Sequence, residues 1–324
     1  MKRSICLITI FLILYGLSLG VSSVISQPYP NRTIQLIIPN VPGSLMDICA
    51  RALSDELGKI IGTQVIIIHK PGAATVLGTD HVARSKKDGY TLVYTGASAL
   101  IYSRVTNPET VPYDPDKDLE PLGNHLFLPL TVTVRADSPW KSFKELVDYA
   151  KNNPGKLRVS TIGVGGIDHF NIELVQALTG AQFTHVPFKG GESVITALLG
   201  GHVEVTFDAF GKVLPHADAG KFRILLLSKK MPGYPQIPTA KELGYKQDLL
   251  TGFFAFYGPA GLPEEVKRVL IPAIEKVVKN PELKVKVEKM GFLVEYKSPA
   301  EMRKMVSEDY ETANTLAIKI GLKK

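Results

Sequence analysis

The chain has 324 residues, of which 45% are hydrophobic and 21% charged, with a formal net charge of +7. This length allows two domains, each with its own core, and the composition is that of a globular protein rather than a disordered or fibrous one. The basic residues are scattered without interleaved aromatic residues, which argues against a nucleic-acid partner.

The N-terminus has the pattern of an export signal, predicted over residues 1–26. Lys2 and Arg3 precede an apolar run from about Ile5 to Val24, and small and polar residues follow it. The run is also nearly long enough to span a bilayer, so an uncleaved anchor is the alternative. Cleavage would leave Cys49 as the only cysteine, and the fold would then rest on packed cores without an internal disulfide. We expect a periplasmic or otherwise extracytoplasmic protein.

Strands and helices then alternate along the chain. Apolar runs at Ile34–Pro39, Val65–Ile68 and Thr91–Tyr94 predict three strands, and helical spacing from Asp47 to Gly58 predicts a helix. Residues Asn107–Pro121 are rich in proline and aspartate and predict an exposed loop. Such alternation favours an α/β fold whose mostly parallel sheets are flanked by helices.

The second half continues this alternation and predicts two domains. Domain 1 is discontinuous, with residues 27–127 and 229–324, and domain 2 comprises residues 128–228. The further strands predicted are Leu130–Val134, Leu157–Ile162, Val203–Phe207, Phe222–Leu227, Gly252–Tyr257 and Phe292–Tyr296. Helices are predicted from Ser142, over Asp168–Leu178, from Pro263 and over Pro299–Ile318.

Two turns that join a strand to a helix are candidates for binding. One passes through Asn40–Ser44 to a helix near Asp47, and the other through Gly163–Gly166 to a helix near Asp168. The first amides of a helix have no internal partners and lie at the positive end of its dipole, so they can bind a carboxylate or phosphate. Two alternatives stay open: the glycines serve packing, and both aspartates are helix caps rather than ligand contacts.

Signatures of catalysis and metal binding are missing from the sequence. It contains no nucleophile elbow, no Ser-x-x-Lys and no Walker phosphate loop. The seven histidines include no His-x-x-x-His pair, and Cys49 has no nearby partner. A histidine just inside a helix, such as His169, is more often a structural hydrogen-bonding residue than a base. We therefore expect no enzyme, no cofactor and no metal.

Eight short blocks occur in one order from Tyr29 to the C-terminus. They are residues 29–32 (YPNR), 47–51 (DICAR), 70–73 (KPGA), 88–92 (DGYTL), 154–157 (PGKL), 185–191 (HVPFKGG), 199–203 (LGGHV) and 237–239 (IPT). With these blocks the chain resembles the tripartite tricarboxylate transporter receptors, the Bug family of periplasmic solute-binding proteins. The resemblance implies a two-domain, type II Venus-flytrap protein, a monomer that delivers a small carboxylate to membrane transporter subunits.

The resemblance also implies which residues contact the ligand. Similar receptors hold a ligand carboxylate with backbone amides and ordered water at two turns, one in each domain. Here those turns are Val41–Asp47 and Gly163–His169, with further contacts after two other strands. The candidate ligand-binding residues are therefore Pro42, Gly43, Ser44, Asp47, Ser98, Gly163, Gly165, Gly166, Ile167, Asp168, His169 and Asp208.

Both turns depart from the family pattern. The family usually has Pro-Pro-Gly-Gly-Gly-Thr-Asp at the first turn, where this chain has VPGSLMD over residues 41–47. The second turn usually carries hydroxyl residues before its histidine, where this chain has Gly166, Ile167 and Asp168. The lost hydroxyls and the added carboxylate should weaken binding of a plain dicarboxylate. If Asp168 contacts the ligand directly, we expect its partner to be an ammonium or a hydroxyl group.

Two other functions share the same cleft. A sensor subunit would present its liganded form to a signalling partner, and the sequence does not separate it from a transport receptor. An enzyme would need Asp168, His169 and Asp208 to converge on one point. The transport receptor is the leading hypothesis.

Overall fold

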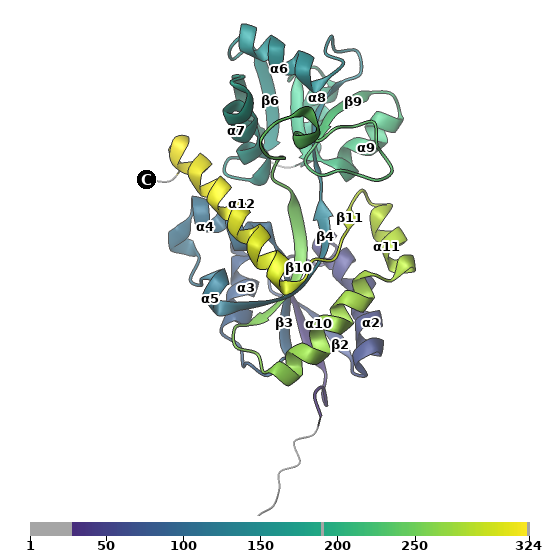
Figure 1. Ribbon diagram of the computed structural model, residues 1–324. Helices are drawn as coiled ribbons and strands as arrows, with labels where there is room; N and C mark the ends of the chain where they lie inside the picture. The colour runs from purple at the N-terminus through teal and green to yellow at the C-terminus, as the bar shows by residue number, and fades with distance from the viewer. Residues whose placement is uncertain (1–27, 189–190, 323–324) are drawn as a thin grey trace, which may run out of the picture.

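The computed structural model describes residues 28–188 and 191–322. The export signal predicted over residues 1–26 lies outside them. Within the described part, two β-sheets with flanking helices form two lobes, one above the other in Figure 1. This confirms the predicted fold class, a two-domain α/β protein. No described helix is both long and apolar enough to cross a membrane.

The first lobe is built on a six-stranded sheet of order β11-β4-β10-β3-β1-β2. Helices α2 and α10 pack on one face, where Leu53 and Leu270 are fully buried against strand residues such as Ile34. Its strands are β1 (Ile34–Ile38), β2 (Val65–His69), β3 (Thr91–Gly96), β4 (Leu119–Leu128), β10 (Gly252–Pro259) and β11 (Leu293–Val294). Its helices are α2 (Leu45–Ile61), α3 (Val76–Ala83), α10 (Glu264–Val278) and α11 (Pro281–Glu288).

The second lobe is built on a five-stranded sheet of order β7-β6-β8-β5-β9. Both faces of its central strands are buried. The sequence of β5 accordingly consists of apolar residues and threonines up to its last residue. Its strands are β5 (Leu130–Arg135), β6 (Leu157–Ile162), β7 (Phe183–Phe188), β8 (Val205–Ala209) and β9 (Phe222–Leu227). Its helices are α6 (Phe143–Asn152), α7 (Ile167–Thr179), α8 (Gly191–Leu199) and α9 (Phe210–Asp218).

The sheets are mixed, whereas the sequence predicted mostly parallel sheets. β1 pairs in parallel with β2 and β3, and β6 pairs in parallel with β7 and β8. β10 runs antiparallel to β3 and β4, and β5 runs antiparallel to β8 and β9. Parallel neighbours need a crossover connection, usually through a helix. The chain instead passes from β4 to β5 through Pro129 alone, and β10 enters the first sheet from the other lobe.

The loop predicted over Asn107–Pro121 is wrong in its second half. It holds the short helices η3 (Pro108–Thr110) and α5 (Pro115–Asp118), and β4 begins at Leu119. Pro121, Gly123 and the polar pair Asn124–His125 interrupt the apolar pattern of β4, so periodicity did not reveal this ten-residue strand. The predicted strand Val203–Phe207 is displaced by two residues in β8.

Helix α12 (Pro299–Lys319) joins the two lobes. It lies diagonally across the molecule in Figure 1, and it contacts β4 in the first lobe and α7 in the second. A capping box between Ser298 and Glu301 fixes its start. The remaining short helices are η1 (Ala73–Thr75), η2 (Ser98–Tyr102), α4 (Ser103–Thr106) and η4 (Lys241–Leu243).

The segment after β9 packs on the second lobe as far as Leu250. Leu227 pairs with Thr239, and the rings of Phe143 and Tyr245 meet edge to face at 6.0 Å. The buried amide of Asn171 donates to the Leu250 carbonyl at 2.9 Å and accepts from the Leu250 amide at 2.8 Å. From these contacts we propose that the second domain extends to about Leu250 rather than ending at residue 228.

Asn171→Ala should lower the free energy of unfolding by about 2–4 kcal/mol, because the buried Leu250 amide and carbonyl would both lose their partner. Urea unfolding measures this loss. Asn152→Ala, an exposed substitution at the end of α6, is the matched control and should change little. Equal losses for the two variants would argue against a domain boundary near Leu250.

Candidate functional site

A cavity of about 510 Å³ lies between the two lobes. The first lobe lines it with the start of α2, with η1, with the region from the end of β3 to α4, and with β10. The second lobe contributes the turn after β6, the start of α7 and the end of β8. The lining residues used below are Leu45, Met46, Thr75, Ser98, Tyr102, Thr106, Gly165, Gly166, Ile167, Asp168, Asp208, Lys212 and Phe254.

Several helices begin at this cavity. α2 begins with Leu45 and Met46, η2 begins with Ser98, and α7 begins with Ile167, all of which line it. Gly166 is the N-cap of α7, and no side chain caps that helix. The first amides of α7 therefore have no partner within the described residues, and they lie at the positive end of the helix dipole. This arrangement can bind an anionic group.

His169 shapes the second turn rather than lining the cavity. Its Nδ1 accepts a hydrogen bond from the Gly165 amide at 3.2 Å, and its ring stacks on His185 with centroids 4.3 Å apart. Burial lowers the pKa of His169, which keeps the imidazole neutral and able to accept that bond. Gly163, with its carbonyl accepting from the Thr161 hydroxyl, also stays outside the lining.

The first turn is closed by Asp47. Its carboxylate accepts from the Gly43 amide at 2.8 Å and pairs with Arg51 and His69, each at 2.9 Å. These bonds and its other neighbours lower the pKa of Asp47 against the opposing effect of burial, which is the largest single cause. The Ser44 hydroxyl accepts from the Asp47 amide and caps α2. The N-cap of α2 is therefore Ser44 rather than Asp47, which instead holds the turn through the Gly43 amide. Pro42, Gly43, Ser44 and Asp47 do not line the cavity.

Asp168 and Asp208 both line the cavity and are 7% and 2% exposed. Asp168 accepts a long bond of 3.5 Å from the Ile162 amide. Burial and then the carboxyl group of Asp208 raise the pKa of Asp168 to about 7. The Oδ1 atom of Asp208 accepts from the Ala209 amide at 2.7 Å and lies 3.6 Å from the Lys212 ammonium. Burial raises the pKa of Asp208 as well.

Unpaired polar atoms are concentrated at this cavity. Four buried side-chain atoms of the described residues have no hydrogen-bond partner, and three belong to lining residues: Thr75 Oγ1, Tyr102 OH and Asp208 Oδ2. The fourth is Asn124 Oδ1. Folded proteins leave few such atoms unpaired, so a polar ligand is the natural partner for the three.

Thr75 and Tyr102 were not among the residues predicted from the sequence. A buried tyrosine usually needs a hydrogen-bond partner for its hydroxyl. The position of Tyr102 inside an apolar run could therefore have indicated a polar contact there. Thr75 follows Ala73 and Ala74, and all three have left-handed backbone angles (φ 45–76°). Non-glycine residues adopt these angles at a cost of roughly 1–2 kcal/mol each, so local preference predicted the opposite.

Of the three residues that an enzyme would need, two line the cavity. Asp168 and Asp208 face the cavity, while His169 is held in the turn by Gly165 and stacks on His185. Among residues 28–188 and 191–322, no three histidine, cysteine, aspartate or glutamate side chains are grouped to hold a metal ion.

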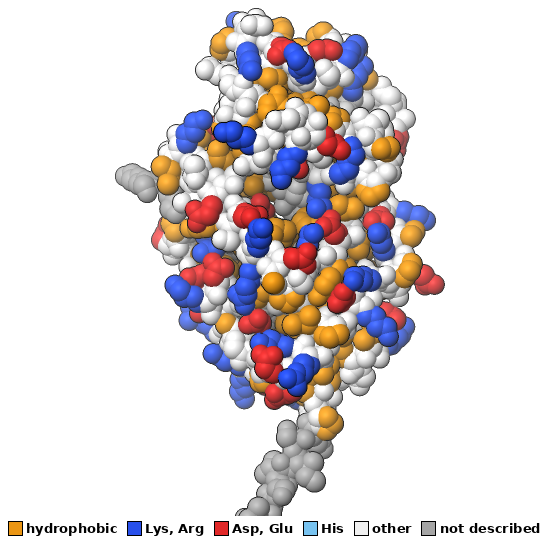
Figure 2. Space-filling view, in the orientation of Figure 1, with side chains coloured by type: hydrophobic (Ala, Val, Ile, Leu, Met, Phe, Trp, Pro, Cys, Tyr) orange, Lys and Arg blue, Asp and Glu red, His pale blue; other side chains and the backbone are white. Residues whose placement is uncertain are grey.

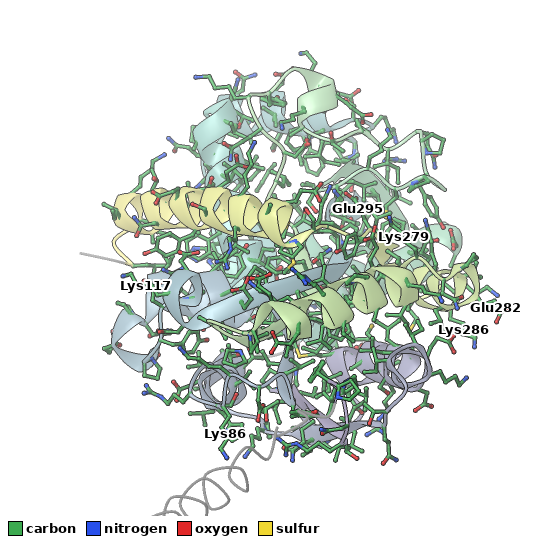
Figure 3. The ribbon with its side chains drawn as sticks, turned by 60° about the horizontal axis from the view of Figure 1, so that its bottom comes forward. Lys86, Lys117, Lys279, Glu282, Lys286 and Glu295 are labelled. Atoms are coloured by element: carbon green, nitrogen blue, oxygen red, sulfur yellow. The ribbon has the colours of Figure 1, made fainter. Side chains whose placement is uncertain are left out.

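The charged surface is evenly mixed on the face shown in Figure 2, where lysines and arginines alternate with acids over both lobes. In Figure 3, Lys279 lies near Glu295, Glu282 and Lys286 lie together farther to the right, and Lys86 and Lys117 lie well away from both pairs. On the face shown in Figure 2, the basic side chains therefore form no continuous patch.

Comparison with protein families places these features in a known group. The family model described as the tripartite tricarboxylate transporter family receptor matches residues 49–322. A UPF0065 protein of Cupriavidus necator is 32% identical over 301 residues, covering 92% of this chain and 90% of its own. The protein BugT of Bordetella pertussis is 29% identical over 313 residues, covering 96% and 95% respectively.

Solved structures share the same two-lobed fold. A TctC solute-binding protein from Polaromonas, solved without ligand, has a TM-score of 0.82 at 26% identity, covering 90% of this chain and 99% of its own. An R. palustris protein solved with adipate has a TM-score of 0.72 at 26% identity, covering 90% and 98%.

Proposed function

This chain belongs to the tripartite tricarboxylate transporter receptor family, and we propose that it captures a small carboxylated molecule between its lobes and delivers it to membrane transporter subunits. The protein acts outside the cytoplasm, as a monomer, and makes or breaks no bond in its ligand. Membership confirms the resemblance seen in the sequence, including its Bug-type character.

One observation carries this proposal: the unpaired polar atoms of Thr75, Tyr102 and Asp208 line the same cavity as the uncapped start of α7. The amides of α7 suit a carboxylate, and the unpaired atoms suit its polar neighbours. The adipate held by the R. palustris relative supports a carboxylated ligand.

The proposed contacts fall into two groups. Ser98, Gly165, Gly166, Ile167, Asp168 and Asp208 line the cavity and can touch the ligand, together with Thr75 and Tyr102. Gly43, Ser44, Asp47, Gly163 and His169 act indirectly, because their hydrogen bonds hold the two turns in shape. Pro42 lies in the first turn, outside the cavity lining.

A carboxylate that binds this cavity should raise the melting temperature, and above Kd the rise should grow with the logarithm of its concentration. Ile167→Pro should weaken that carboxylate roughly ten-fold or more, because proline at the first position of α7 keeps the helix but removes one amide donor. Thermal shift over a panel of organic acids identifies a binder, and titration calorimetry then measures the variant.

Glu264→Pro is the matched control, since Glu264 is the exposed first residue of α10 and lies outside the cavity. It should leave the affinity as it is. Equal affinities for Ile167→Pro and the unchanged protein would contradict an anion site at the start of α7.

A further inference from the structure

Two acidic side chains come together on the second lobe's side of the cavity. Asp208 lies in β8 near its carboxyl end, and Asp168 lies in α7, just after the neighbouring strand β6. β6 and β8 run parallel, so both groups lie at the same edge of the sheet. The carboxyl group of Asp208 is, after burial, the largest cause of the raised pKa of Asp168. The two carboxyl groups therefore form one acidic cluster.

Among residues 28–188 and 191–322, the cluster has one neighbouring cation. Lys212 of α9 lies 3.6 Å from Asp208 Oδ1, is 34% exposed, and leaves Oδ2 without any partner. In the described part of the chain, the other ionisable groups near the pair are the Tyr102 hydroxyl of η2, Glu192 of α8, and His169, which follows Asp168 in α7. None of these adds a positive charge at neutral pH, since burial lowers the pKa of His169 and raises that of Tyr102.

A ligand that carried only carboxylates would bring a further negative charge into this setting. The amides of α7 can bind one carboxylate, but they offer nothing to Asp208 Oδ2, which is an acceptor when ionised. A buried carboxylate oxygen without a donor is costly, and an ammonium group supplies both the donor and the opposite charge.

We propose that Asp168 and Asp208 form a cation subsite, and that the ligand carries an amine beside its carboxylate. The ligand class is then an amino-carboxylate, with its carboxylate on the α7 amides and its ammonium between the two aspartates. This inference rests on the proposed function, because it names the kind of acid that the same cavity takes.

The two ligand classes should change the number of bound protons in opposite directions. With a pKa of about 7, Asp168 holds a proton on roughly half of the free molecules at neutral pH. An ammonium favours the ionised carboxylate and lowers this pKa, so binding should release protons and strengthen as pH rises from 6 to 8. A plain dicarboxylate would raise the pKa, take up protons and bind more weakly over the same interval.

The test uses matched acids in three forms: unsubstituted, 2-hydroxy and 2-amino. Propionate, succinate, glutarate, adipate and 3-phenylpropionate supply the five series. Calorimetry at pH 7 should find a series in which the 2-amino form binds at least about ten-fold more tightly than the other two. In two buffers of different protonation enthalpy, that binding should release protons. Asp168→Asn should abolish the release.

Asp208→Asn should reduce the preference for the 2-amino form by about ten-fold or more, while Asp218→Asn, at the exposed end of α9, should preserve it. Unsubstituted or hydroxy acids that bind as tightly as their amino counterparts would overturn the cation subsite and leave the proposed function standing. If no acid of any form binds, the proposed function itself is overturned.

Discussion

Gly165→Val should abolish ligand binding, with a loss of at least about 100-fold in affinity, or about 3 kcal/mol. Gly165 has a left-handed backbone angle (φ 80°), which valine adopts only with strain. A Cβ atom here would also lie 2.9 Å from Thr106 Cγ2, on the opposite lobe. The added side chain would therefore distort the turn at the α7 amides and push the lobes apart across the cavity.

Calorimetric titration with an acid identified by thermal shift measures this loss. Gly180→Val is the matched control, because Gly180 ends the same helix with a similar angle (φ 77°) and its Cβ would meet only Lys151 Cε at 3.9 Å. Both variants should lose similar stability, of order 1–2 kcal/mol, but only Gly165→Val should lose binding. Parallel losses of stability and affinity in both variants would mean that Gly165 serves the fold alone.

The second turn could be found from the sequence because its signal is local. Glycines at 163, 165 and 166 follow a β-rich run and precede a helical pattern, and the run, the glycines and the start of the helix lie within about fifteen residues. Local spacing of this kind needs no knowledge of the rest of the chain. The strand Leu157–Ile162 and the start of α7 were accordingly predicted to within a residue.

The different roles of Asp47 and Asp168 could not be read in this way. Each follows a turn and lies in the first turn of a helix, so local pattern treats them alike. Asp47 is paired with Arg51 in its own helix and is within hydrogen-bond distance of His69 at the end of β2. Asp168 instead meets another acid, Asp208, contributed forty residues later by β8. Which side chain lies beside each aspartate depends on the order of the strands in the sheet. Local secondary-structure propensity does not determine that order.

The order of the strands could not be predicted either, because it also depends on long-range contacts. β10 lies between β3 and β4 and runs against both, because the chain re-enters the first lobe from the second. The packing of residues 231–250 on the second lobe depends on the same re-entry, through Asn171 and Tyr245. Alternation of strands and helices indicates the fold class, but the crossings between lobes are set by long-range contacts.

Close contact between the lobes is made by two glycines. Gly211 lies in the first turn of α9, and a Cβ atom there would lie 2.3 Å from the Met290 carbonyl oxygen. The facing Gly291 approaches so closely that its own Cβ would lie 2.3 Å from Gly211 Cα. The 290–291 turn leads into β11 of the first sheet, whereas α9 belongs to the second lobe, as Figure 1 shows. This contact lies beside the crossing at Leu128–Pro129.

Gly211→Ala should therefore weaken ligand binding by about ten-fold or more without unfolding the protein. Alanine is favoured over glycine inside a helix by roughly 0.5–1 kcal/mol, so α9 itself should gain stability. The added methyl group would clash with the backbone of Met290. No flexible side chain is there to move aside, so the two segments must separate. A small separation near the crossing becomes a larger one at the far side of the cavity, where Thr106 faces Gly165. The ligand then reaches only one lobe.

Calorimetry and small-angle scattering with a confirmed binder separate this outcome from a local one. The unchanged protein should close on its ligand and show a smaller radius of gyration, whereas Gly211→Ala should stay expanded at the same ligand excess. Gly233→Ala is the control, because a Cβ there meets nothing within 4 Å and its backbone angle is ordinary. If the 290–291 turn moves locally instead, Gly211→Ala will bind the ligand and become compact like the unchanged protein. That result would mean that the contact between the two glycines does not limit closure.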